Sequence, residues 1–165
     1  MRARSNRRAV LGMMVAVAIA CDSSASFGPH ELSRLAVARS RWDGRPFADY
    51  TYEVRIECFC PPEITRWTRV SVLDGAVVAA EAVEPDPDFP INDIRYWRPI
   101  DSLFVALHRA MTEQASRAFL DAIIVDYDTE LGFPTSIEYR AKHNVADGGS
   151  ISTLRNVQPL VADRR

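Results

Sequence analysis

The chain of 165 residues carries 20 basic and 22 acidic side chains, which gives a formal net charge of −2 at pH 7. A chain of this length suits one domain with a single sizeable core and is too short for two. Because the charge is slightly acidic and the arginines form no cluster, the chain lacks the electrostatic footprint of a nucleic-acid-binding protein. We therefore expect no nucleic-acid partner.

The first twenty residues have the pattern of an export signal. An uncharged apolar run from Ala9 to Ala20 follows four arginines, Arg2, Arg4, Arg7 and Arg8. Its twelve residues are too few to span a bilayer as a helix, which takes about twenty, but they fit the core of a signal peptide. We therefore predict that residues 1–20 are a signal peptide. The Arg7-Arg8 pair also resembles a twin-arginine signal, so the general and the twin-arginine export routes both fit.

The apolar run ends in Ala18-Ile19-Ala20-Cys21, which resembles the lipobox of bacterial lipoproteins. In that motif the cysteine thiol is acylated and the cysteine becomes the new N-terminus. The resemblance implies lipidation at Cys21 and a stable membrane anchor that does not span the bilayer. The protein would then face the periplasm or the cell exterior. An ordinary secretory signal followed by a chance cysteine is the alternative.

Residues 21–29 are small and polar and are predicted to form a flexible tether, which leaves residues 30–165 as a single domain. Removal of the four signal arginines leaves 16 basic and 22 acidic residues, a net charge of about −6. Apolar residues recur at spacings of three and four from Glu31 to Trp42, which predicts a short helix. Gly44 and Pro46 then supply a stop signal.

The segment DYTYEVRIECFC, residues 49–60, alternates between polar and apolar side chains. This alternation predicts a half-buried strand with Cys58 and Cys60 on its apolar face and Glu53 on its polar face. Two prolines follow directly and end the strand.

A hairpin and a long loop are predicted next. Strands at Arg66–Leu73 and Ala76–Val83 flank Asp74-Gly75, the dipeptide that best fits a tight two-residue turn. From Glu84 to Pro99, four prolines prevent regular structure and leave a partly acidic loop. The loop carries three aromatic candidates for contact with a partner, Phe89, Tyr96 and Trp97.

The apolar residues between Ile100 and Met111 form the stripe of a helix that lies on a sheet. Strands follow at about 122–127, 136–140 and 151–157, with turn residues between them. The order is therefore α-βββ-α-βββ, and the short links within each group of strands imply antiparallel neighbours. We predict an α+β domain with a single antiparallel sheet of five to six strands and one main helix, Ile100–Met111, packed on one face.

At this point three segments carry a resemblance to a family. The strand that ends in CFCPPE, the helix that opens with IDSLF and the run VDYDTELGFPTSIEY resemble a family of small bacterial lipoproteins known only as domain of unknown function sixty-one seventy-four. The similarity covers about Asp49–Leu160, and it differs at Pro99, where the family has a helix-capping threonine. The resemblance implies a fold and a location outside the cytoplasm, and it implies no reaction.

Patterns for catalysis or metal binding are weak. The carboxylates of DYDTE, residues 126–130, resemble the start of a calcium loop, but that loop needs a glycine and a glutamate where Leu131 and Ile137 stand. The three histidines, His30, His108 and His143, have no spacing that would place two on one face. We therefore predict no catalytic residue, no metal site and no cofactor.

Cys58 and Cys60 allow three interpretations. A thiol redox site usually has two residues between its cysteines at a helix N-terminus, and a Cu(I) site would need further soft ligands. A structural disulfide fits an oxidising compartment. Residues two apart in a regular strand are separated by about 6.7 Å, while bridged cysteines need Cβ atoms about 3.8 Å apart. A disulfide therefore requires the chain to bend at Phe59, and we hypothesise that it does.

The sequence favours a lipid-anchored lipoprotein with a non-catalytic binding or structural role in the cell envelope. Its partners would be the membrane, through the N-terminal lipid, and an envelope protein or ligand whose identity the sequence does not show. The alternative is a redox- or copper-handling lipoprotein that uses the Cys58 and Cys60 pair.

Overall fold

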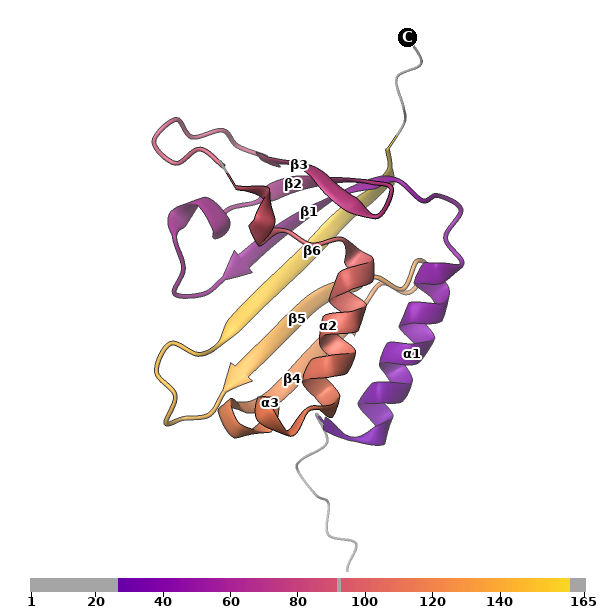
Figure 1. Ribbon diagram of the computed structural model, residues 1–165, viewed down its shortest axis with the longest axis vertical. Helices are drawn as coiled ribbons and strands as arrows, with labels where there is room; N and C mark the ends of the chain where they lie inside the picture. Colours follow the sequence, from indigo (N-terminus) through magenta and orange to yellow (C-terminus); the bar gives the residue numbers. More distant parts are fainter. Residues whose placement is uncertain (1–26, 92, 161–165) are drawn as a thin grey trace, which may run out of the picture.

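Six strands form one antiparallel sheet in the computed structural model, which describes residues 27–91 and 93–160 (Figure 1). The strands are β1 (Tyr50–Glu57), β2 (Thr68–Leu73), β3 (Ala76–Ala82), β4 (Leu120–Tyr127), β5 (Pro134–Ala141) and β6 (Ser150–Pro159). Their order across the sheet is β3-β2-β1-β6-β5-β4. The predicted signal peptide, Cys21 and most of the predicted tether lie outside the described residues.

The sheet consists of two three-stranded groups that meet at its centre. β1, β2 and β3 follow one another along the chain and lie side by side, and so do β4, β5 and β6. β6 then pairs antiparallel with β1, with Val54 opposite Leu154. The last strand of the chain therefore joins the two groups, and the predicted α+β fold with a single antiparallel sheet is confirmed.

The helix layer covers one face of this sheet and is larger than the sequence predicted. α2 (Ile100–Thr112) buries the predicted apolar stripe, Ile100, Phe104, Leu107 and Met111. α1 (Pro29–Asp43) lies beside it on the same face and buries Leu35, Ala38 and Trp42 (Figure 1). A short helix that the sequence did not predict, α3 (Gln114–Phe119), follows α2 after one extended residue, Glu113. No helix in the described part of the chain has the length and apolar character needed to cross a membrane.

A buried aromatic cluster ties the helices to β1. The Trp42 ring of α1 meets the Tyr50 ring of β1 edge to face, with centroids 5.1 Å apart. The Tyr50 hydroxyl accepts a hydrogen bond of 2.8 Å from the backbone N–H of Ile100, the first residue of α2. Pro99 has no side chain that could cap this helix, and Tyr50 of β1 instead accepts the hydrogen bond from this buried N–H, which has no acceptor within the helix. Burial raises the pKa of Tyr50, so the phenol stays neutral in this contact.

Two glycines stand where the backbone requires them. Asp74 and Gly75 have φ values of 51° and 74°, the two positive values of a type I′ turn, which confirms the predicted hairpin between β2 and β3. Gly132, in the turn between β4 and β5, has φ of 81° and lies against α1. A Cβ at this position would stand 2.3 Å from the carbonyl oxygen of Ala38, so only glycine lets this turn reach the helix.

Candidate binding cleft beside the cysteine turn

The chain turns sharply where β1 ends. β1 extends to Glu57, short of the predicted end at Cys60, because the chain bends at Cys58 and Phe59. Cys58 and Cys60 lie at disulfide-bond distance, with Cα atoms 5.2 Å apart, which is well below the spacing of about 6.7 Å in a regular strand. Phe59 at this bend is 87% exposed. The bend that a disulfide requires at Phe59 is therefore present in the structure.

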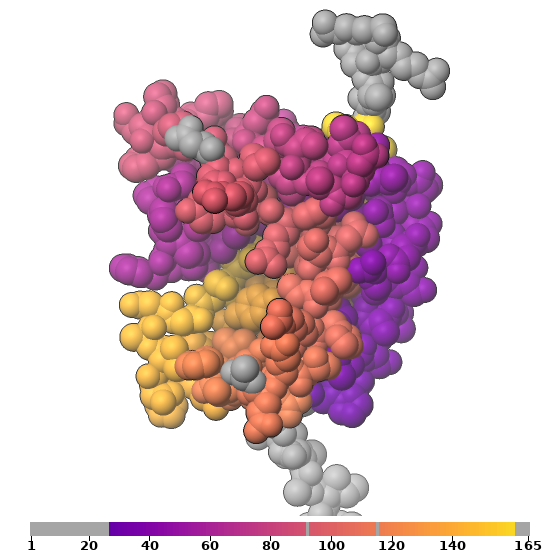
Figure 2. Space-filling model, in the orientation of Figure 1, coloured from indigo at the N-terminus to yellow at the C-terminus, as the bar shows by residue number. Residues whose placement is uncertain are grey.

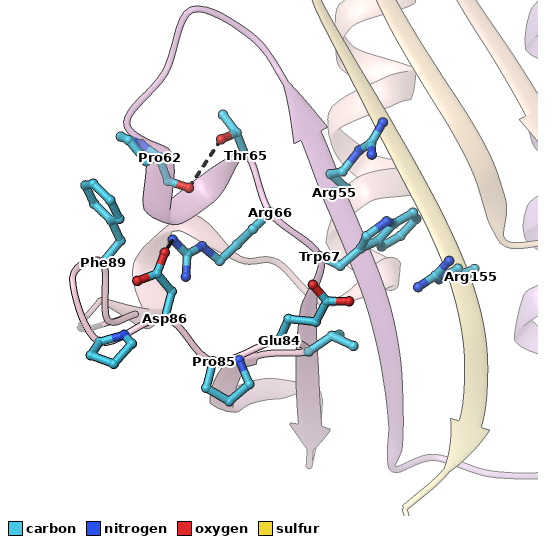
Figure 3. A pocket seen from close by; sticks show the side chains of 12 residues that line it. Arg55, Pro62, Thr65, Arg66, Trp67, Glu84, Pro85, Asp86, Phe89 and Arg155 are labelled. Carbon is cyan, nitrogen blue, oxygen red and sulfur yellow. Dashed lines mark hydrogen bonds and ion pairs between the residues drawn. The ribbon is translucent and has the colours of Figure 1, made fainter.

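A tryptophan held between two arginines lies next to this turn, on the face of the sheet without helices. Trp67 precedes β2, and the guanidinium carbon of Arg155, from β6, lies 3.7 Å from the centroid of its ring. The corresponding carbon of Arg55, from β1, lies 5.6 Å from that centroid. Figure 3 shows the three side chains in a row across β1 and β6. Such cation–π contacts fix the ring and both guanidinium groups in place.

The predicted acidic loop forms the opposite wall. Arg66 donates a hydrogen bond of 3.3 Å to Asp86, and its guanidinium carbon lies 5.8 Å from the ring centroid of Phe89. Asp86 also accepts a hydrogen bond of 3.0 Å from the backbone N–H of Asp88, which folds the loop tip. Arg66 therefore holds the loop at a defined distance from Trp67.

Between these walls lies a cleft with a volume of about 690 Å³, a size typical of ligand and peptide-segment sites (Figure 3). We refer to it as the arginine–tryptophan cleft. It combines apolar surfaces of Trp67, Phe89 and the loop prolines with the charged groups of three arginines and two acidic side chains. The Nε atoms of Arg55 and Arg66 are buried and have no hydrogen-bond partner among the described residues. The cleft therefore combines flat apolar surfaces with arginine side chains.

The buried carboxylate of Glu53 positions Arg155, one of the side chains that line this cleft. Glu53 is only 5% exposed, although the alternation of β1 correctly places it on the polar face. It accepts hydrogen bonds of 2.9 Å from Arg69, 3.0 Å from Arg155 and 2.9 Å from Asn156. Burial alone raises the pKa of Glu53, but these hydrogen bonds outweigh burial and hold the pKa below its usual range. Glu53 thus stays ionised and positions Arg155 against Trp67.

The predicted partner contacts have different surroundings. Phe89 is 43% exposed and lines the arginine–tryptophan cleft, and Tyr96 is 51% exposed. Trp97 is only 5% exposed and belongs to the core, so the prediction of Trp97 as a partner contact is wrong. The long loop folds its tryptophan inward because the 3₁₀ turn Ile94–Tyr96 brings the chain back to the sheet before α2 begins.

The remaining polar motifs build local structure. The Asp128 carboxylate of DYDTE accepts hydrogen bonds of 3.0 Å and 2.7 Å from the backbone N–H groups of Glu130 and Leu131, which stabilise the turn after β4. Within the described residues, no three histidine, cysteine, aspartate or glutamate side chains gather closely enough to hold a metal ion.

The fold and the cleft define a small α+β domain with helices on one face of an open antiparallel sheet and a candidate binding cleft at the edge of the other. The profile of a protein family matches residues 34–159, and its description reads "Family of unknown function (DUF6174)". The chain belongs to this family, as the resemblance in its sequence implied. No curated protein and no solved structure matches the chain.

Proposed function

We propose that this protein is a lipid-anchored component of the bacterial cell envelope with a non-catalytic binding role, and that the arginine–tryptophan cleft holds a segment of its partner. The export signal and the lipobox-like Ala18-Ile19-Ala20-Cys21 support the anchored location. The single observation that carries the binding role is the cleft itself, with Trp67 held between two arginines opposite a loop that is tied down by Arg66.

The chemistry of the cleft suits recognition of a peptide segment. Exposed apolar rings and prolines contribute contact area, and arginine donors bind carboxylates or backbone carbonyls. Asp86 is already paired with Arg66, and the Thr65 hydroxyl donates to the carbonyl of Pro62, so these groups support the walls. A general acid or base would instead need a group whose pKa lies near the working pH. The side chains that dominate the cleft are instead arginines, which act as hydrogen-bond donors.

The redox or copper alternative uses Cys58 and Cys60. Their sulfur atoms lie at bond distance, so the bonded pair offers no thiolate to a metal until it is reduced. Cu(I) titration of the protein in the presence of a mild reductant separates the two functions, because a structural disulfide resists mild reduction, whereas a copper-handling pair would be reduced to thiolates. The binding role predicts no copper uptake, and stoichiometric uptake would favour the alternative.

Site-specific photo-crosslinking in cells tests the proposed role. A photo-reactive phenylalanine analogue at Phe89 should yield a defined crosslinked species, because this ring is 43% exposed and lines the cleft. The matched control is Phe119, which is 63% exposed but lies at the end of α3. Trp67→Ala should lower the yield at Phe89 and leave the yield at Phe119 unchanged. Equal products from both positions, or a yield at Phe89 that Trp67→Ala does not alter, would contradict the proposal.

A further inference from the structure

A second recess lies on the opposite, helix-bearing face of the sheet. α2 covers only part of this face, and Figure 2 shows the surface hollowed beside α2, with β5 and β6 deeper in the recess. The recess has a volume of about 300 Å³. Strands β1, β5 and β6, helix α2 and the segment that precedes α2 all contribute to its walls. It is separate from the arginine–tryptophan cleft, which lies on the face without helices.

The interior of this recess is apolar. Ile137 of β5 and Leu154 of β6 form its floor, and both are only 2% exposed. Ile56 of β1 and the pair Leu103 and Ala106 of α2 line its sides and are half-buried. These side chains leave apolar surface accessible to a ligand within a concave site, which is the usual setting for small-molecule binding.

One cationic group lines the recess. Arg98 is exposed, and no carboxylate of the described residues lies within ion-pair distance of it. Its neighbour Arg95 differs, because it forms an ion pair of 2.7 Å with Asp93. Most arginines near the sheet are likewise paired, whereas Arg98 has no ion-pair partner among the described residues and lies beside an apolar cavity.

Tyr139 and Trp97 also line the recess with Arg98. Burial raises the pKa of Tyr139, with an opposing effect from the charge of Arg98, so its phenol is a neutral donor at physiological pH. The Trp97 ring also forms part of the wall, and its indole N–H is buried without a hydrogen-bond partner among the described residues. By contrast, the Tyr52 hydroxyl is engaged, because it donates a hydrogen bond of 2.5 Å to the carbonyl of Arg98.

We propose that this recess binds a small molecule with an apolar chain that ends in a single carboxylate. The chain would occupy the space between Leu103, Ala106 and the sheet, and the carboxylate would bind the planar guanidinium of Arg98 through two parallel hydrogen bonds. One arginine matches one negative charge, and a volume near the lower limit of ligand sites favours a short chain. The proposal depends neither on the lipid anchor nor on the arginine–tryptophan cleft.

Titration of the purified full chain with octanoate, followed by backbone amide NMR, tests this inference. We expect saturable shifts at Ile56, Ala106 and Ser152, three residues that line the recess. 1-Octanol, which has the same chain without the charge, should bind at least tenfold more weakly, because it cannot form the charged hydrogen bonds. Shifts confined to residues outside the recess, or equal affinity for the acid and the alcohol, would overturn the proposal.

Three variants separate the contribution of the Arg98 charge to binding from that of the apolar cavity. Arg98→Gln should weaken octanoate binding at least tenfold and leave 1-octanol binding unchanged. The matched control Arg95→Gln removes a nearby arginine that does not line the recess and should change neither affinity. Ala106→Phe should fill the cavity and abolish binding of both compounds, with circular dichroism as the check that the variant is folded. Equal effects of the two arginine variants, or full octanoate binding by Ala106→Phe, would refute the inference.

Discussion

The buried carboxylate of Glu53 gives the sharpest test of how the cleft is held. The change Glu53→Gln keeps the size of the side chain and removes its charge. Arg69 and Arg155 would then lose an ionised acceptor, and the hydrogen bond from Asn156 would become a neutral one. Because Arg155 lies over the Trp67 ring, the same change also loosens a wall of the arginine–tryptophan cleft.

The size of the expected destabilisation depends on how exposed the hydrogen-bond partners of Glu53 are. Hydrogen bonds to a charged group contribute about 1.5 to 3 kcal/mol each when they are well shielded. Glu53 is well shielded, but the side chains of Arg69 and Arg155 are 52% and 47% exposed, and water screens such partners. We expect the combined loss of these interactions to lower the free energy of unfolding by about 2 kcal/mol at pH 7.

Urea unfolding at two pH values measures this effect. A loss of about 2 kcal/mol lowers the urea midpoint by roughly 1 M for a domain of this size. The folded-state pKa of Glu53 lies below its usual range, so the network stabilises the fold above the unfolded-state pKa of about 4.3. This stabilisation disappears as the pH falls through the folded-state pKa. The difference between wild type and Glu53→Gln should therefore shrink in acid.

The control is Glu81→Gln, which removes a carboxylate from the same face of the sheet. Glu81 lies opposite Arg69 across β2 and β3 but is exposed, so its loss should change stability by less than about 0.5 kcal/mol. If Glu53→Gln costs no more than Glu81→Gln, or if its cost is the same at acidic and neutral pH, the reasoning about the buried carboxylate is wrong.

Two further predictions concern the cysteine turn and the helix contact. Alkylation of the denatured protein should label Cys58 and Cys60 only after reduction, and full labelling without reductant would show that the pair is not bonded. Gly132→Ala should lower the free energy of unfolding by at least about 2 kcal/mol, because the new Cβ would stand 2.3 Å from the Ala38 carbonyl oxygen at φ of 81°. Gly75→Ala, where no atom lies within 4 Å, should cost only about 1 kcal/mol, and thermal unfolding that ranks the two variants the other way would contradict this account of the Gly132 contact.

Local features of the fold could be predicted because each depends on neighbouring residues. The apolar stripe of α2 shows its period within one segment, and Asp74-Gly75 supplies the two positive φ values of its turn. Short links between strands were sufficient to predict antiparallel neighbours within each group. The bend at Phe59 could also be anticipated, since the spacing of two bonded cysteines is incompatible with a straight strand.

Features that depend on residues far apart in the chain could not be predicted. Glu53 is buried by Arg155, which is 102 residues away and reaches it only because β6 pairs with β1. Trp67 gives no sign in the sequence that two other strands supply the arginines beside it. The sequence pattern predicts a loop around Trp97, but such a pattern does not show which aromatic side chain folds into the core. The sequence does not predict α3, because a helix of six residues is too short to show a period.

The proposed envelope role depends most directly on the N-terminus. An intact mass of the full-length gene product recovered from bacterial membranes reports both cleavage before Cys21 and acylation of its thiol. The account predicts a mature chain that starts at Cys21 and carries the added mass of acyl chains. A chain that retains residues 1–20, or one that starts elsewhere with Cys21 unmodified, would contradict the anchored role.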